Sequence, residues 1–441
     1  MKLLLVVCVL SAGVVAQEVY TPLATMNGRS FTVQDLPSDV GNAWQKLPST
    51  LIQARKDLLE LQIDNLLLLQ EAKKRAMKLD TLIDIEVHSK VAKPSEATIK
   101  ATYEKNKASL NGMGLEQVRE PIVNYLKSES EKKAMDAYRK KLRSAAKIEY
   151  VTDVNKSKPS LNDVFATVNA EPITYAMYKR KNGLPIYEYE ANVFDQMDSS
   201  LRLVVDSAVY SAEAQSRGIP VNKLMADEVT SKIKEFSPTE YKRLENALKQ
   251  RLYEKYRVKY FVKEPKPYKQ RVSVDDDPVM GKNSANVTIV VFADFECPAC
   301  AGVHPVIKSL VQKYGDRVRL VYRDFPLPKV HKNAIPAARA AFAANKQGKF
   351  FEYSEKLYQN QANLDEASLV KYAAELKLDT AKFSADMKSP ESMAEIEKDI
   401  ADAKEYGVAG TPSIFVNGYK IRTLSVQAFE NAVERALSGS L

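Results

Sequence analysis

Two cysteines separated by two residues are the part of this sequence best suited to do chemistry. Cys297 and Cys300 stand in the order Cys-Pro-Ala-Cys, and the one other cysteine of the chain is Cys8. A disulfide between positions this close together closes almost no loop, so it would stabilise the fold little. A zinc site would need two more ligands, and none of the three histidines stands in zinc-finger spacing. The pair is therefore predicted to carry out thiol–disulfide exchange.

The residues around this pair predict that it lies at the start of a helix. Residues 286–292 form an apolar, β-branched run typical of a buried strand, and an amphipathic segment that ends near Tyr314 follows the pair. At a helix N-terminus the free backbone N–H groups and the helix dipole favour a thiolate, which makes Cys297 the expected nucleophile. Pro298 fits the first helical turn because it has no N–H to lose. Cys300 lies one turn further and is expected to be more buried and to act as the resolving thiol.

The rest of the C-terminal region alternates strands and helices. Residues 318–322 predict a second strand, residues 333–406 a series of helices, and residues 413–416 a third strand. An Asn-Gly pair at 417–418 is a strong hairpin signal, and a final helix is expected over 426–437.

This order of elements resembles the DsbA-like thiol–disulfide oxidoreductases, which have a thioredoxin fold with a helical insertion. The resemblance covers about residues 284–441 and is carried by DFECPAC (294–300), YRDFPL (322–327), QGKF (347–350) and VAGTPSIFVNG (408–418). It implies a cis-proline at Pro412 that faces the cysteines, preceded by Thr411, whose backbone would bind an extended substrate segment. It also implies no cofactor beyond the redox-active disulfide itself.

Two features depart from the pattern of these oxidoreductases. Many of them carry a buried carboxylate six residues before the first cysteine as a proton relay. This chain has Val291 there, so a relay would use Asp294, Glu296 or water. The strongest oxidants have a histidine between the cysteines, whereas this chain has Pro298 and Ala299, so a milder oxidant is expected.

Two histidines of this region need separate interpretation. His304 lies one turn beyond Cys300 and could modulate the redox pair, but the adjacent Pro305 favours a structural role at a helix kink. His331 is expected to cap or hydrogen-bond a loop.

The N-terminal half contains a tandem repeat with a constant offset of 142 residues. Residues 24–27 (ATMN) recur as 166–169 (ATVN), and Glu-Ala at 71–72 recurs at 213–214. Chance matches would not keep one register over this distance, so we interpret the region as two copies of one module. Each copy is expected to begin with a short strand, to continue as a long helix with a wide apolar stripe, and to end in a strand.

The second copy resembles the chaperone region of SurA-type periplasmic folding factors. The pattern V-N-x-x-x-I-T, a leucine-rich helix and E-A-x-x-R-G-I fits best over Ala166–Ile219, while the first copy departs from it at residues 75–77. The two modules are assigned to 17–151 and 164–262. No parvulin domain fits between their helices, so prolyl isomerase activity is not expected.

The start of the chain and its charge limit the possible location and partners of the protein. Residues 1–16 predict a cleavable secretory signal peptide, which would remove Cys8. No later segment reaches the ~18 apolar residues that a membrane span needs. The formal charge of +9 is spread along the chain, so nucleic-acid binding is not expected. Residues 263–283 are expected to link the modules to the domain at 284–441.

Together these features predict a multidomain protein with two mostly α-helical SurA-like modules, followed by an α/β thioredoxin-fold domain with a helical insertion. The leading hypothesis is a periplasmic disulfide oxidoreductase or isomerase whose modules hold unfolded or misfolded exported proteins near Cys297, served by a membrane or soluble redox partner. The alternative is a holdase chaperone or assembly scaffold with a secondary redox domain. Net oxidation and isomerisation both stay open, as does the oligomeric state, with a homo-oligomer as one option. No metal ligands or cofactor-binding residues are expected.

Overall fold

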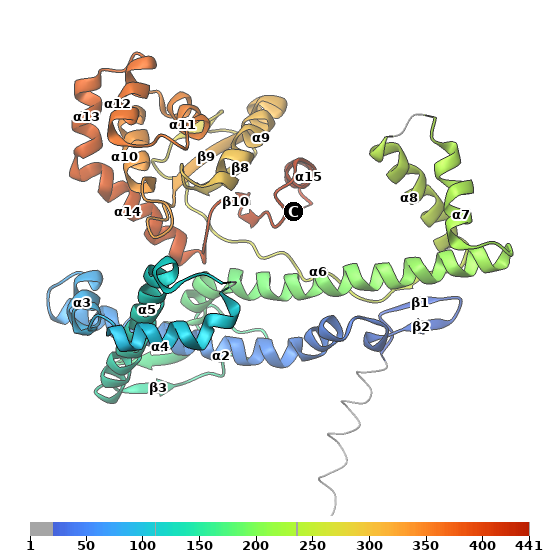
Figure 1. The fold of residues 1–441 in the computed structure, drawn as a ribbon, viewed down its shortest axis with the longest axis horizontal. Helices are drawn as coiled ribbons and strands as arrows, with labels where there is room; N and C mark the ends of the chain where they lie inside the picture. The colour runs from blue at the N-terminus through green and yellow to red at the C-terminus, as the bar shows by residue number, and fades with distance from the viewer. Residues whose placement is uncertain (1–20, 111, 235–236, 441) are drawn as a thin grey trace, which may run out of the picture. The chain divides into compact units, whose positions relative to one another are not determined.

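The computed structural model describes residues 21–110, 112–234 and 237–440 and contains two compact units (Figure 1). One unit combines Met1–Leu51 with Arg180–Leu441, and the other is Ile52–Lys179. The predicted signal peptide, residues 1–16 with Cys8, lies outside the described residues. In the part of the chain that is described, no helix is both long and apolar enough to cross a membrane.

The unit Ile52–Lys179 is mostly helical and contains a three-stranded antiparallel sheet. Its sheet has the order β3 (Ile148–Tyr150), β4 (Val164–Val168), β5 (Glu171–Thr174). Its helices are α2 (Ser38–Lys74), which begins in the other unit, α3 (Leu79–Glu86), α4 (Glu96–Asn106) and α5 (Leu115–Ser144). Leu68, Leu82 and Tyr138 belong to one small core cluster and hold α2, α3 and α5 together.

The N-terminal part of the larger unit has the same kinds of elements. Its sheet has the order β2 (Arg29–Phe31), β1 (Ala24–Met26), β6 (Lys259–Tyr260). Its helices are α6 (Tyr175–Ser216), which begins in the other unit, α7 (Val221–Glu228) and α8 (Pro238–Lys255). The apolar stripe of α6, which includes Met197, Leu201 and Val205, packs against Phe31 in one core.

The two copies of the repeat exchange their last strands. β3 ends the first copy and pairs with β4 of the second, whereas β6 ends the second copy and pairs with β1 of the first. The registers are equivalent: Tyr150 lies opposite Ala166, and Tyr260 lies opposite Ala24. Ala24 is the counterpart of Ala166 in the first copy, 142 residues earlier. Each compact unit therefore contains parts of both copies and does not coincide with either repeat, 17–151 or 164–262.

Equivalent positions of the two copies form equivalent ion pairs. Arg75 bridges Glu71 and Glu86 in the first copy, each at 2.6 Å. In the second copy the equivalent guanidinium, that of Arg217, bridges the two equivalent glutamates at 2.7 and 2.9 Å. The same ion pairs therefore connect the end of the long helix to the short helix that follows it, α2 to α3 in the first copy and α6 to α7 in the second.

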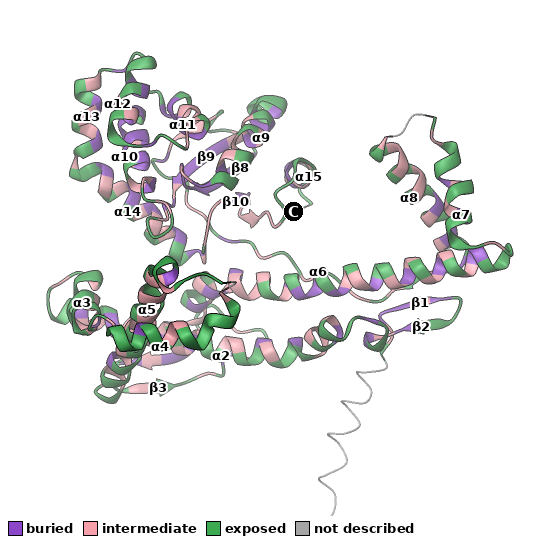
Figure 2. Cartoon of the chain, viewed as in Figure 1, coloured by how far each residue is buried: buried purple, intermediate pink, exposed green. Residues whose placement is uncertain are grey.

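The C-terminal domain is built on a mixed five-stranded sheet with the order β11-β10-β8-β9-β7. β8 (Val287–Ala293) and β9 (Val318–Asp324) are parallel, and β10 (Ser413–Val416), β11 (Tyr419–Lys420) and β7 (Val279–Met280) are antiparallel to their neighbours. The strands expected at 286–292, 318–322 and 413–416 are confirmed. All but one residue of β8 are buried (Figure 2), which explains its continuous apolar sequence.

Helices cover both faces of this sheet. Val291 of β8 shares one core with Cys300 of α9 (Pro298–Tyr314) and with α15 (Val426–Leu437), while Phe292 shares the opposite core with α14 (Pro390–Glu405). The helical insertion follows β9. It consists of α10 (Ala334–Asn345), α11 (Phe350–Gln359), α12 (Glu366–Glu375), α13 (Thr380–Lys388) and α14.

Part of the expected linker, 263–283, belongs to this domain. β7 lies within it and pairs with β9, and the backbone N–H of Gln270 donates to the carbonyl of Gly418 at 2.8 Å. Asp277 is buried, and its carboxylate lies 3.3 Å from the guanidinium of Arg323. The domain therefore begins before the expected residue 284. The polar residues that suggested a linker belong to it because Asp277 contacts the buried Arg323 and β7 pairs with β9.

Candidate active site

The two cysteines lie where β8 ends and α9 begins. Cys297 is the N-cap residue of α9 with extended backbone, and Pro298 occupies the first helical position. Both thiols are free, and the residues are 7% and 1% exposed, respectively, so Cys300 is the more buried. Burial raises the pKa of the Cys300 thiol. The arrangement thus has one thiol at a helix N-terminus and a second that favours its protonated form.

Strand pairing brings a second segment to the first cysteine. Ser413 of β10 lies opposite Phe292 of β8, so the residues just before β10 meet the residues just after β8. The Cys297 sulfur lies 3.6 Å from the carbonyl oxygen of Thr411, and the Thr411–Pro412 peptide bond is cis, as the resemblance implied. A substrate that binds the Thr411 backbone would therefore lie beside the Cys297 sulfur.

An aromatic cluster belongs to the same core as the second cysteine. Phe295 stacks on Tyr322 with ring centroids 5.1 Å apart and an interplanar angle of 11°, and the Tyr322 hydroxyl lies 2.7 Å from that of Tyr358. Burial raises the pKa of both tyrosines well above the usual value. Both hydroxyls are therefore protonated at neutral pH.

His304 packs against this cluster rather than hydrogen-bonding to the redox pair. Its ring centroid lies 4.8 Å from that of Tyr358, and its Nε2 is sealed from solvent without a hydrogen-bond partner among the described residues. Burial lowers the pKa of His304, so the ring is neutral at pH 7. These contacts agree with the structural role favoured for this residue.

The two carboxylates considered as proton relays brace the loop instead. Asp294 accepts hydrogen bonds from the backbone N–H groups of Glu296 and Leu327, both at 2.8 Å, and its other contact is His331 Nδ1 at 2.8 Å. Glu296 accepts from the N–H of Asn333 at 2.6 Å. Both carboxylates are thus bound to fixed donors, and His331 contacts a loop carboxylate in keeping with its predicted role.

Sequence reasoning missed a glutamine that holds the cysteine loop. The Gln361 side-chain amide donates to the carbonyl oxygens of Phe295 at 2.8 Å and Cys297 at 2.9 Å. Gln361 lies between α11 and α12, more than sixty residues from the loop that it braces. No local pattern marks such a residue, because only the packing of the helical insertion brings it to the redox pair.

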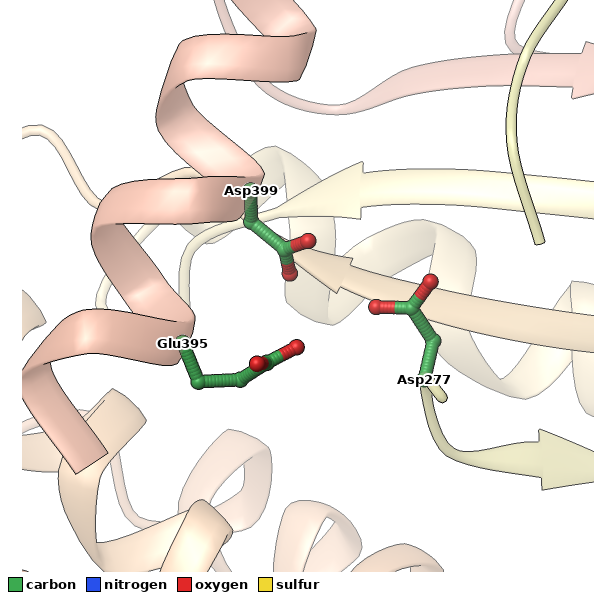
Figure 3. Close-up of side chains that lie close together, drawn as sticks. All are labelled: Asp277, Glu395 and Asp399. Carbon is green, nitrogen blue, oxygen red and sulfur yellow. The ribbon is translucent and has the colours of Figure 1, made fainter. Parts of the chain in front are cut away.

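A second group of titratable side chains lies on the opposite side of β9. Oxygens of Asp277, Glu395 and Asp399 lie within 4.8 Å of one another, on two segments distant in sequence (Figure 3). The fully buried Arg323 lies 2.5 Å from Asp399. Burial raises the pKa of Asp277 to about 9 and that of Asp399 to about 6. Such oxygens could bind a cation, but Arg323 already supplies a positive charge among them, so we interpret the group as a buried ion pair of Arg323 and Asp399 beside the protonated Asp277.

Comparisons with known proteins identify the domain. The family described as Thioredoxin matches residues 273–435. Among curated relatives, Na(+)/H(+) antiporter NhaA 3 of Salinispora tropica is 39% identical over 177 residues, which is 38% of this chain and 27% of that protein. The NhaA antiporter of Herminiimonas arsenicoxydans is 36% identical over 151 residues, 34% of this chain and 24% of that protein. The chain thus spans about a quarter of the length of these relatives.

Solved structures align with the same share of the chain. A thioredoxin-like oxidoreductase from Silicibacter pomeroyi is 34% identical with a TM-score of 0.34, and covers 37% of this chain and 92% of its own. Oxidised BdbD from Bacillus subtilis is 25% identical with a TM-score of 0.36, covering 39% and 99%. Wolbachia pipientis α-DsbA1 is 21% identical with a TM-score of 0.35, covering 38% and 94%. These TM-scores are low, so the assignment rests on the family match: residues 273–435 form a thioredoxin domain.

Proposed function

We propose that this chain is an exported thiol–disulfide oxidoreductase that acts on the cysteines of folding proteins. The observation that carries the proposal is the pairing of a thiol at a helix N-terminus, Cys297, with a buried thiol one turn away, Cys300. Cys297 lies beside the free N–H groups of the first helical turn, and burial raises the pKa of the Cys300 thiol, which keeps that thiol protonated until it reacts. The thioredoxin match over residues 273–435 supports this division of roles.

The exchange reaction balances with these two residues and a substrate dithiol. When the Cys297–Cys300 disulfide is present, a substrate thiolate attacks the Cys297 sulfur, the disulfide breaks, and Cys300 leaves with the electron pair. A second substrate thiolate then attacks the substrate sulfur of the mixed disulfide and releases Cys297. The substrate is oxidised to a disulfide and the enzyme is reduced to two thiols. The reverse sequence reduces or reshuffles substrate disulfides.

The helical modules at 17–151 and 164–262 are proposed to hold the client. The unit Ile52–Lys179 exposes apolar side chains, including Leu69 and Val151 at 51% and 61%, and has a cavity of about 290 Å³ beside Leu59, Tyr150 and Val154. An extended, incompletely folded chain offers complementary apolar side chains. Prolonged contact of this kind favours reshuffling of wrong disulfides, so isomerisation is the direction that we favour, with an unidentified redox partner setting the balance.

The rival function is a holdase chaperone or scaffold in which the redox pair is secondary. The full-length chain and a Cys297→Ser/Cys300→Ser variant should be compared in three assays: reactivation of a scrambled multi-disulfide protein, oxidation of the same protein when reduced, and suppression of its aggregation. We expect the variant to lose both disulfide reactions and to keep aggregation suppression. Unchanged client rescue by the variant would reject the enzyme in favour of the holdase. Rapid oxidation by the wild type without reactivation would show a net oxidase.

A further inference from the structure

One exposed segment of the larger unit concentrates positive charge. Residues 257–271, the basic segment, run from β6 toward β7 and contain a single anion, Glu264. The cations of the segment are all exposed and are Arg257, Lys259, Lys263, Lys266, Lys269 and Arg271. Just before the segment, Lys255 pairs with Glu213, but none of these six cations forms an ion pair with a residue that the structure describes. Their charge is therefore left for solvent or for a partner.

Strand geometry places two of these cations and an aromatic ring in one row. The backbone N–H of Phe261 donates to the carbonyl of Leu23 at 2.9 Å, so extended pairing continues beyond β6. Alternate positions of this stretch pack against the core and are Val258, Tyr260 and Val262. The positions between them, Lys259, Phe261 and Lys263, are exposed, and Phe261 is 53% exposed. Side chains at every second residue share a face and lie roughly 7 Å apart, so this face presents a cation, a ring and a cation.

The first copy of the repeat shows that the strand does not need these lysines. Tyr150 of β3 and Tyr260 of β6 are equivalent by their pairing with β4 and β1. Three exposed positions of the two copies therefore correspond, and the pairs are Glu149 and Lys259, Val151 and Phe261, and Asp153 and Lys263. Glu149 lies 2.9 Å from Lys147, which balances the charge of the first copy. The second copy has lysines in place of both acids, which points to a negatively charged partner at this copy alone.

We propose that the basic segment binds the surface of a membrane that contains anionic phospholipids. Lysine and arginine side chains near such a surface are attracted to its phosphates, and an exposed aromatic ring can enter the headgroup layer between them. A headgroup layer carries negative charge along its whole extent, so it matches cations spread over residues 257–271. An acidic protein would need an exposed acidic run of the same length.

Docking of this kind would hold the redox domain beside a membrane. The basic segment leads directly into β7 of the C-terminal domain, and the N–H of Gln270 donates to the carbonyl of Gly418, which fixes the end of the segment to that domain. The signal peptide predicted at 1–16 would bring the chain to such a surface. The inference goes beyond the proposed function and needs neither cysteine.

The test measures how the mature chain, residues 17–441, sediments with phosphatidylcholine vesicles that contain or lack phosphatidylglycerol. We expect the wild type to bind only the vesicles with phosphatidylglycerol. It should be released as salt rises from about 0.1 M to about 1 M, because the Debye length then falls from about 10 Å to about 3 Å. Equal binding to both kinds of vesicle would overturn the proposal.

A variant that carries the residues of the first copy tests the segment itself. Each Lys or Arg near an anionic surface strengthens binding roughly fivefold, so Lys259→Glu/Lys263→Asp should bind at least ~25-fold more weakly. The matched control is Lys371→Glu/Lys382→Asp on α12 and α13, which makes the same change of charge at two other exposed lysines. The control should bind as the wild type does. An equal loss in both variants would overturn the proposal, because net charge and not this segment would then govern binding.

Other anionic partners are outcomes of the same experiment. Polyglutamate represents an acidic polypeptide and oligothymidylate a single strand of nucleic acid. Both should bind the wild type more weakly than the vesicles do at an equal concentration of negative charge. Binding of either one as tight as that of the vesicles would overturn a lipid surface as the partner.

Hydrogen exchange on the wild type keeps the proposal testable if the Lys259→Glu/Lys263→Asp variant does not fold. Vesicles with phosphatidylglycerol should slow deuterium uptake in peptides that cover 257–271 and leave peptides that cover 371–382 unchanged. Uptake that does not change at 257–271 would overturn the proposal. None of these measurements involves thiol–disulfide exchange, so their failure is distinct from failure of the client assays.

Discussion

The sulfur of Cys297 lies 3.6 Å from the backbone carbonyl oxygen of Thr411, although the two residues are 114 positions apart in the chain. The contact exists because β10 pairs with β8, which aligns the segment before one strand with the segment after the other. A substrate held along the Thr411 backbone would therefore present its sulfur to Cys297 and not to the more buried Cys300.

This geometry predicts different outcomes for the two single cysteine variants. Cys300→Ser should accumulate a mixed disulfide between Cys297 and a client, because the nucleophile is intact and the resolving thiol is gone. Cys297→Ser should trap almost none, since Cys300 is 1% exposed. Non-reducing electrophoresis after incubation with a reduced or scrambled client measures both. Equal trapping by both variants would contradict the assigned roles.

Removal of the loop carboxylate should destabilise the thioredoxin domain. Asp294→Ala leaves the N–H groups of Glu296 and Leu327 without their acceptor, and each buried unsatisfied donor costs ~1–3 kcal/mol. We expect a loss of about 2–4 kcal/mol in the free energy of unfolding in urea. Asp316→Ala, which removes an exposed partner of Lys282, is the control and should cost less than about 1 kcal/mol. A loss no larger than that of the control would show that the loop does not depend on this side chain.

The buried acid beside Arg323 should make stability fall as pH rises. Asp277 has a folded-state pKa of about 9 against a usual value of 3.8, so from about pH 4 to about pH 9 the folded state keeps a proton that the unfolded state releases. Asp277→Asn cannot ionise and should lose this part of the pH dependence, so that its Tm rises relative to the wild type as pH increases. Thermal unfolding over this range measures the difference.

Asp276→Asn is the matched control for that experiment. Asp276 is the preceding residue and pairs with Lys398, but its side chain is 68% exposed. The control should follow the wild-type pH dependence. If the Tm values of Asp277→Asn and Asp276→Asn change with pH in the same way, the buried carboxyl of Asp277 does not cause the fall of stability with pH.

The tandem repeat supplies its own matched pair of variants. Glu213 has a side chain that is 3% exposed and contacts Arg217, Lys255 and Tyr256 at 2.7, 2.5 and 3.0 Å. Its counterpart Glu71 is 17% exposed, with Arg75 at 2.6 Å. We expect Glu213→Gln to cost about 1–3 kcal/mol and Glu71→Gln less than about 1 kcal/mol in urea unfolding. A larger loss of stability in Glu71→Gln than in Glu213→Gln would show that burial of the glutamate does not determine the cost.

Local sequence determined the redox pair, the main strands and the repeat. Cys297 and Cys300 are three positions apart, and short-range patterns of apolar residues define the strand before them and the helix after them. The Asn417-Gly418 turn and the common offset of 142 residues are likewise visible without a structure.

Tertiary structure alone decided which distant segments meet. Three features join residues that lie far apart in the chain: the strand exchange between the copies, the contact of Gln361 with the cysteine loop, and the ion pair of Arg323 with Asp399. Two edge strands of equivalent sequence can pair with either copy, and a buried polar side chain has no periodicity that reveals its partner. The choice depends on which arrangement buries the most apolar surface while leaving few polar groups unpaired, and that is a property of the whole fold.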